Sequence, residues 1–118
     1  MAYTNDAKHV MLNQLGTVAG FVSLHTASPG TTGANEVTAA GPYARQAITW
    51  NAASGGNLDS SNQPQFTVPA STTVSHFGVW SAVTGGTFYG GAALSASENF
   101  TAEGTYTLTD VDLDLNAA

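Results

Sequence analysis

Short segments in which polar and apolar side chains alternate, separated by glycine-rich turns, dominate this chain of 118 residues. The alternation is clearest at residues 43–50, where Arg45 lies on the polar side and Ile48 and Trp50 lie on the other. A period of two residues places successive side chains on opposite faces of a β-strand. Six or seven short strands with such turns favour a mainly β fold, either a small antiparallel β-sandwich or a jelly-roll-like barrel. The other strands are predicted at residues 20–26, 65–68, 72–81, 87–94, 104–109 and 110–115.

One short N-terminal α-helix is predicted before the strands, over about residues 5–16. Thr4 or one of the two polar residues after it can cap the helix, and Gly16 can end it. Between these limits the apolar residues Ala7, Met11 and Leu15 recur every fourth position. This spacing places them on one face, as in a helix that packs against a core.

The length and the distribution of strands predict a single domain over residues 1–118, with the β-sandwich at about 20–115. Residues 52–64 consist largely of Gly, Ser, Asn and Gln, and they are predicted to form a long surface loop. A domain boundary at this loop is the alternative. We reject it because neither half of the chain alone holds enough apolar strands for a core.

Charged side chains are scarce and mostly acidic. Two basic residues stand against eight acidic ones, which gives a formal net charge of −6 and a charged fraction of 8%. With no basic patch to neutralise phosphates, direct binding to nucleic acid is not expected. The sequence shows no secretory leader and no apolar run of ~20 residues, so we expect synthesis in the cytoplasm and no membrane partner. Because charged side chains are few, electrostatic repulsion between copies of the chain is weak. A homo-oligomer is therefore expected, with a trimer as one candidate.

Three aspartates alternate with apolar residues near the end of the chain: Asp110, Asp112 and Asp114. The opening of a calcium-binding loop has the same pattern, but such a loop needs glycine where Leu115 stands and a bidentate glutamate further on. In a strand the three carboxylates lie on one face about 7 Å apart, too far to share one ion. We therefore predict a solvated or partner-facing strand edge and no metal site.

The sequence offers no arrangement typical of catalysis. It has no cysteine, and neither a Gly-x-Ser-x-Gly nor a Ser-x-x-Lys motif is present. His9, His25 and His76 lack the close spacing of zinc ligands; His9 is expected to be exposed, and the other two partly buried and hydrogen-bonded. Glu98 and Glu103 are expected in a solvated turn. The prediction is a protein that is not an enzyme, with no catalytic residue and no cofactor.

Aromatic residues and the single arginine supply the remaining candidates for binding. Trp50 and Trp80 are predicted to lie in the core, which leaves Tyr43 and Tyr89 as the better surface candidates. A sugar-binding module is the alternative use of these rings. Arg45 is interpreted either as an ion-pair or interface anchor, with Glu36 as a candidate partner, or as an ordinary surface charge.

Several of these segments together resemble a family of small structural proteins from tailed bacteriophages, of the actinobacteriophage type and often labelled tail fibre or minor structural proteins. The resemblance covers most of residues 8–115 and implies a virion component without catalytic activity, made in the host cytoplasm. The segments that carry it are Val22-Ser23-Leu24-His25-Thr26-Ala27-Ser28-Pro29-Gly30, Thr32-Gly33-Ala34-Asn35-Glu36-Val37, Tyr43-Ala44-Arg45-Gln46-Ala47, His76-Phe77-Gly78-Val79-Trp80-Ser81-Ala82 and Thr84-Gly85-Gly86-Thr87-Phe88-Tyr89-Gly90-Gly91-Ala92-Ala93-Leu94.

The sequence has neither heptads nor a repeated β motif for a fibre shaft, which favours a compact knob. We therefore expect a capsid decoration or minor capsid protein on the outer face of the head shell. A tail-fibre or tail-tip subunit is the alternative, followed by a host-glycan-binding module. The expected partners are the major capsid protein or tail proteins. The candidate interface residues are Tyr43, Arg45, Tyr89, Asp110, Asp112 and Asp114.

Overall fold

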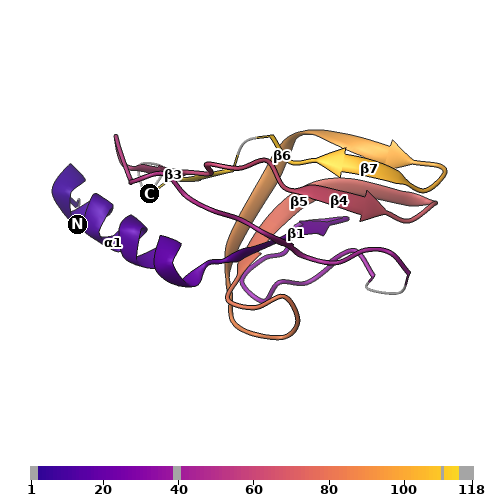
Figure 1. Ribbon diagram of the computed structural model, residues 1–118, viewed down its shortest axis with the longest axis horizontal. Helices are drawn as coiled ribbons and strands as arrows, with labels where there is room; N and C mark the ends of the chain where they lie inside the picture. Colours follow the sequence, from indigo (N-terminus) through magenta and orange to yellow (C-terminus); the bar gives the residue numbers. More distant parts are fainter. Residues whose placement is uncertain (1–2, 39–40, 110, 115–118) are drawn as a thin grey trace.

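The computed structural model describes residues 3–38, 41–109 and 111–114 and consists of antiparallel β-structure with one N-terminal helix (Figure 1). This confirms the predicted fold class. Four strands form the main sheet in the order β2-β1-β5-β6, and two separate pairs, β3-β8 and β4-β7, complete the fold. The elements are α1 (Asn5–Val18), β1 (Phe21–His25), β2 (Gln46–Ala47), β3 (Asn57–Asp59), β4 (Gln65–Val68), β5 (Thr72–Trp80), β6 (Phe88–Phe100), β7 (Gly104–Thr107) and β8 (Asp112–Asp114).

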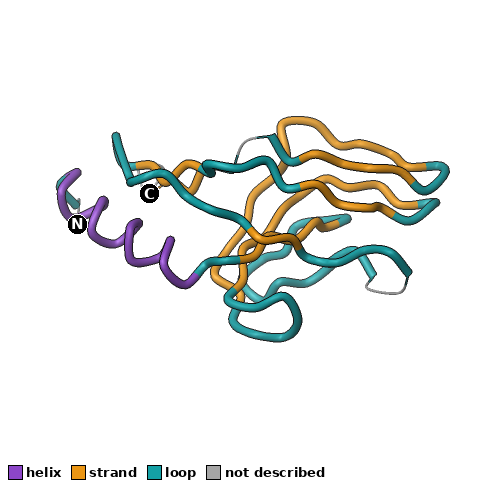
Figure 2. Tube along the Cα trace, in the orientation of Figure 1, coloured by secondary structure: helices purple, strands orange, loops and turns teal. Residues whose placement is uncertain are grey.

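The molecule is elongated, with extents of 46 × 24 × 23 Å. Figure 1 shows α1 and β3 at one end of the long axis, with the turns that join β4 to β5 and β6 to β7 at the other end. The same view coloured by secondary structure shows the strands concentrated in the half away from the helix (Figure 2). The two ends therefore offer different surfaces, one helical and one made of tight turns.

The core fills the space between the main sheet and the β4-β7 pair. Val22 and Leu24 of β1 are fully buried, and so are Phe66 and Val68 of β4. Their burial removes apolar surface from water, which is the main force that holds two sheets together. The same cluster includes Val37, Tyr43, Ile48, Val74, Phe77, Phe100, Leu108 and Val111.

Helix α1 begins as predicted. The Thr4 side chain accepts a hydrogen bond from the Ala7 backbone N–H at 3.2 Å, which caps the start. The helix runs to Val18, two residues beyond the glycine predicted to end it. Gly16 stays within the helix and faces the body: a Cβ there would lie 3.4 Å from both Leu58 and Trp50.

The strand predicted at residues 43–50 is much shorter than expected. Only Gln46–Ala47 pairs with β1, because the chain then turns away to other partners. The Ile48 N–H donates to the Gly20 carbonyl at 3.0 Å, and the Thr49 N–H donates to the side chain of Asn62 at 3.0 Å. The alternating polar and apolar pattern of residues 43–50 therefore extends beyond the two residues that form β2.

Two further predictions from the sequence were wrong. The expected loop at residues 52–64 contains β3, because Leu58 is buried and pairs with Leu113 of β8. Strand β6 continues to Phe100 instead of ending at residue 94, and Glu98 pairs with Val74 inside it. Glu103 does lie in the turn after β6. In both places a long-range backbone pairing overrides a polar local sequence.

Candidate functional site

The best-formed polar cluster surrounds Arg45, just before β2. Its Nε and Nη2 atoms each donate to one oxygen of Glu36 at 2.9 Å. Its Nη1 atom donates to the carbonyl of Ala82 at 3.1 Å and to that of Gly85 at 2.8 Å. The Arg45 and Glu36 side chains are 10% and 22% exposed, so this ion pair is largely shielded from water. The predicted pairing with Glu36 is confirmed.

The guanidinium of Arg45 also stacks on Trp80, with 3.6 Å between its central carbon and the ring centroid. A cation over an indole face is attracted by the ring's electron density. One side chain therefore joins three segments: Glu36 from the loop after β1, Trp80 at the end of β5, and the turn between β5 and β6. We call Arg45, Glu36 and Trp80 the arginine clamp.

Tyr43 does not lie on the surface, and its predicted exposure was wrong. Its side chain is 4% exposed and its ring stacks on Phe66, with centroids 6.2 Å apart. The hydroxyl donates to Glu36 at 2.9 Å and accepts from the Leu24 N–H at 3.0 Å. Burial raises the pKa of Tyr43 well above its ordinary value of 10.0. Tyr43 therefore positions the Glu36 carboxylate and is not available to an outside partner.

A second buried chain of hydrogen bonds lies behind Trp80. The Trp80 indole N–H donates to Ser23 Oγ at 2.8 Å, and Ser23 Oγ lies 2.6 Å from Nε2 of His25. The Nδ1 atom of His25 lies 2.7 Å from the carbonyl of Ala34. Because a carbonyl only accepts, Nδ1 carries a proton, and in the neutral ring Nε2 accepts from the serine hydroxyl. This confirms the expected burial and hydrogen bonding of His25.

The serine and histidine are within the distance used by a nucleophile and its base. Both side chains are nevertheless fully buried. Ser23 lies opposite Gly78 across the β1–β5 pairing, and the ring of Phe88 packs at 6.4 Å from that of His25. No face of the pair is open to a substrate. The arrangement fastens the loop at Ala34 to the sheet.

The stability of the protein is expected to fall as the pH drops through the unfolded-state pKa of His25. Burial lowers the pKa of this histidine in the folded state from its ordinary value of 6.5, against the opposing bond to Ala34. Below about pH 6.5 the unfolded chain therefore binds a proton that the folded chain does not, which favours unfolding. Between pH 7.5 and 5.5, urea unfolding should show stability falling by up to about 1.4 kcal/mol per pH unit.

His25→Gln should remove this pH dependence even though the variant is less stable. The wild-type protein provides a second measurement that needs no variant: the titration of the His25 ring, followed by NMR, should lie below pH 6.5. A titration midpoint near 6.5 would contradict the structural role of the buried neutral ring.

The other candidate interface residues lie on different elements. Tyr89 is at the start of β6 and is 40% exposed, as predicted. Asp112 and Asp114 are exposed on β8, where they pair in register with Asp59 and Asn57 of β3. Asp110 lies outside the described residues. The structure therefore does not bring the six sequence candidates into one site.

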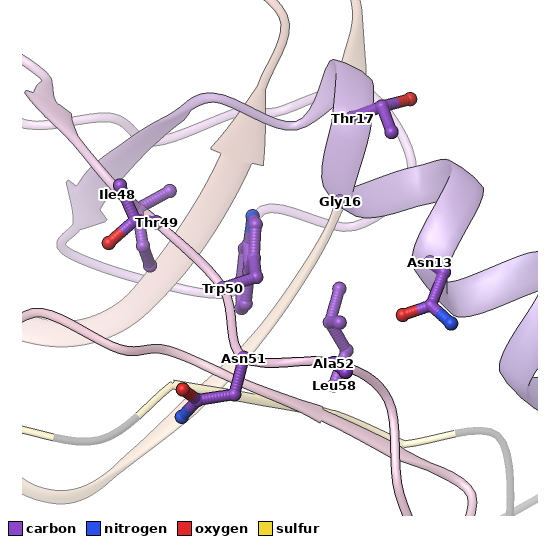
Figure 3. A pocket seen from close by; sticks show the side chains of 9 residues that line it. All are labelled: Asn13, Gly16, Thr17, Ile48, Thr49, Trp50, Asn51, Ala52 and Leu58. Carbon is purple, nitrogen blue, oxygen red and sulfur yellow. The ribbon is translucent and has the colours of Figure 1, made fainter.

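A pocket of about 370 Å³ lies between α1 and the segment before β3 (Figure 3). Trp50 is partly buried there, and its indole N–H donates to the carbonyl of Ala19 at 2.9 Å. The Asn13 side chain accepts from the Ala53 N–H at 2.8 Å, which ties the helix to this segment. The side chains around the pocket are uncharged. His9, expected to be exposed, is half-buried on the same helix and accepts from the Gly56 N–H at 3.1 Å.

Neither a metal centre nor a membrane helix emerges from the described residues. Across residues 3–38, 41–109 and 111–114, no group of three His, Asp or Glu side chains comes together to hold a metal ion. In the same part of the chain, α1 is too short and too polar to cross a bilayer.

The fold is antiparallel β-structure, and its best-formed polar cluster holds loops of the same chain together. This arrangement is typical of a structural protein. Comparison with protein families gives the particular family: residues 8–116 match the one described as Podophage GP4 fiber I protein gp80. The chain belongs to this family of phage fibre structural proteins, which is not an enzyme class. It is accordingly a virion component. The search of curated proteins found no match.

Proposed function

We propose that the chain is a non-enzymatic fibre subunit of the phage particle that acts by binding other virion proteins. The family match over nearly the whole chain carries this proposal. The internal use of the polar groups supports it, because the arginine clamp holds loops in place and so presents a rigid surface. A rigid surface binds with less loss of conformational entropy than a mobile one.

The acidic face of β3 and β8 is the surface that we assign to another virion protein. Asp59, Asp112 and Asp114 are exposed there, while Leu58 and Leu113 turn toward the body. Carboxylates on two paired strands create a local negative potential, which attracts a basic patch and orients its approach. The expected partner is therefore a tail or capsid protein with lysines or arginines at the contact.

Neutralising this face should reduce incorporation into the particle. In Asp59→Asn/Asp112→Asn/Asp114→Asn, we expect at least a tenfold loss of the protein from purified virions, measured by quantitative mass spectrometry against the major capsid protein. Asp6→Asn/Glu98→Gln/Glu103→Gln removes the same number of charges from other exposed positions and should incorporate normally. Unchanged incorporation of the first variant would show that this face is not the attachment surface.

Decoration of the head shell is the second candidate. The observation in its favour is that the described chain forms one body, with strands of 2–13 residues and no repeated unit from which a shaft could be built. Cryo-electron microscopy of the virion tests both locations. Density for this fold on appendages supports the fibre proposal, whereas density on capsid hexamers or symmetry axes supports decoration.

A further inference from the structure

A groove lies between β6 of the main sheet and β8 of the β3-β8 pair. It consists of two adjoining hollows of about 350 and 260 Å³. Phe77 of β5 and Asp112 of β8 line both hollows, so the two are continuous. The first hollow reaches Leu12 of α1 and Ala92 of β6, and the second reaches Leu108. We call this feature the β6–β8 groove.

The β6–β8 groove opens onto the apolar interior of the protein. Its lining includes four apolar side chains that are half-buried: Leu15, Leu94, Tyr106 and Leu113. The last three pack against the hydrophobic core. Apolar surface that stays in contact with water beside a core favours an apolar occupant, because covering it removes that surface from water.

Both walls of the groove are strands at the border of their sheets. Among the residues that the structure describes, β6 pairs with β5 alone and β8 with β3 alone. Strand β6 curves along the body from its middle to the far turns (Figure 1). A border strand presents backbone N–H and C=O groups that can pair with one more strand, unless lysine, proline or a bulge prevents it.

The part of β6 beside the groove has none of these protective features. Residues 90–93 pair without interruption with residues 76–79 of β5, and the bulge comes only after them. They are two glycines and two alanines, so no charged side chain or proline blocks the approach of a strand. The backbone of an extended segment in the groove would therefore have a strand border beside it.

Charge selects what kind of segment fits. Asp112 and Asp114 are exposed on β8 and line the groove, so an apolar interior is bordered by negative charge. This combination complements apolar side chains that are flanked by lysine or arginine. The chain itself has no such extended segment: its two basic residues are Lys8, which lies in α1, and Arg45, which is bound in the arginine clamp. A second copy is thus a poor occupant.

We propose that the β6–β8 groove binds an extended segment of another virion protein, in which apolar residues alternate with lysine or arginine. Successive side chains of a strand point to opposite sides, so the apolar ones can enter the groove while the basic ones meet Asp112 and Asp114. The main chain of the segment pairs with a strand border. This inference rests on the proposed function, because it specifies the form of the partner that reaches the acidic face of β3 and β8.

A labelled peptide tests the recognition without a virion. The probe is a fluorescein-labelled heptapeptide of alternating lysine and valine, and fluorescence anisotropy with the full chain measures its binding. It should bind at least tenfold more tightly than a lysine–serine heptapeptide of equal charge, because valine buries apolar surface and serine does not. Asp112→Asn/Asp114→Asn should weaken the binding, and so should added salt. Equal binding of the two peptides, or no binding of either, overturns the proposal.

One substitution inside the groove has a matched control outside it. Ala92→Lys places a long cationic side chain on an exposed position of the groove wall and should reduce binding of the lysine–valine peptide at least tenfold. Ala47→Lys makes the same change at an exposed position of β2, on the opposite border of the main sheet, and should bind as the wild type does. Urea unfolding of both variants checks that the loss comes from the groove. Binding that tolerates Ala92→Lys contradicts the proposal.

The virion identifies the partner. A photoreactive benzoylphenylalanine in place of Ala92 should cross-link to a segment of a different virion protein that has lysine or arginine beside the linked residue. Cross-links to a second copy alone overturn the inference. If Ala92→Lys is incorporated normally while Asp59→Asn/Asp112→Asn/Asp114→Asn is lost from the particle, the groove is wrong and the acidic face remains the attachment surface. If both variants are incorporated normally, the proposed attachment surface is wrong as well.

Discussion

Replacing Arg45 with methionine should lower the free energy of unfolding by about 3 kcal/mol, a large share of the 5–15 kcal/mol typical of a small domain. The variant keeps the apolar stem of the side chain but removes both guanidinium donors to the Glu36 carboxylate, which retains the Tyr43 hydroxyl. It also removes the donor to the Ala82 and Gly85 carbonyls. Groups that are shielded from water and lose their partners destabilise the fold more than an exposed ion pair would. Urea unfolding followed by tryptophan fluorescence measures the change, since Trp80 lies directly under the guanidinium.

Two further variants separate charge from geometry. Arg45→Lys retains the positive charge but not the planar fork, so it should recover only part of the loss. Glu36→Gln/Arg45→Met removes both charges and should cost less than the two single substitutions added together. If the free energy of unfolding of Arg45→Met lies within about 0.5 kcal/mol of the wild-type value, Arg45 is an ordinary surface charge.

Strands whose own apolar side chains are buried could be predicted from the sequence. Strands that depend on pairing with a distant segment could not. β4 and β5 lie where the sequence placed them, because Phe66 and Val68 bury one face of β4, and β5 buries the four residues from Phe77 to Trp80. β3 has one buried residue, Leu58, and it exists because β8 pairs with it from more than 50 residues away. No local property of a Gly- and Asn-rich segment encodes that contact.

The contacts of the candidate site also include some that could be predicted from the sequence and some that could not. The Arg45–Glu36 pair was predictable because a single arginine has few carboxylates to choose from. The stacking on Trp80 and the chain from Ser23 to His25 depend on the register between β1 and β5, which no local pattern specifies. The sequence predicted Tyr43 on the surface because tyrosine is commonly half-exposed. Its hydroxyl, however, forms hydrogen bonds with Leu24 and Glu36, which offset the loss of its bonds to water on burial.

Replacing Gly78 with alanine should destabilise the fold by about 2–4 kcal/mol, although the change adds a single methyl group. A Cβ at this position would lie 2.8 Å from Phe88, 2.9 Å from Nε2 of His25 and 2.9 Å from Oγ of Ser23. All three distances are shorter than a carbon contact allows. Because Ser23 and His25 are fully buried and hold each other in place, the methyl group can be accommodated only by breaking the hydrogen-bond chain.

Gly20→Ala is the matched control. Gly20 has no atom within 4 Å of an added Cβ, so that variant should unfold like the wild type or gain about 0.5 kcal/mol from a stiffer unfolded chain. In Gly78→Ala, the loss of stability should be accompanied by a red shift of the Trp80 emission, because Ser23 no longer holds the indole N–H. A variant with wild-type stability and emission would mean that the Ser23–His25 chain can shift without cost.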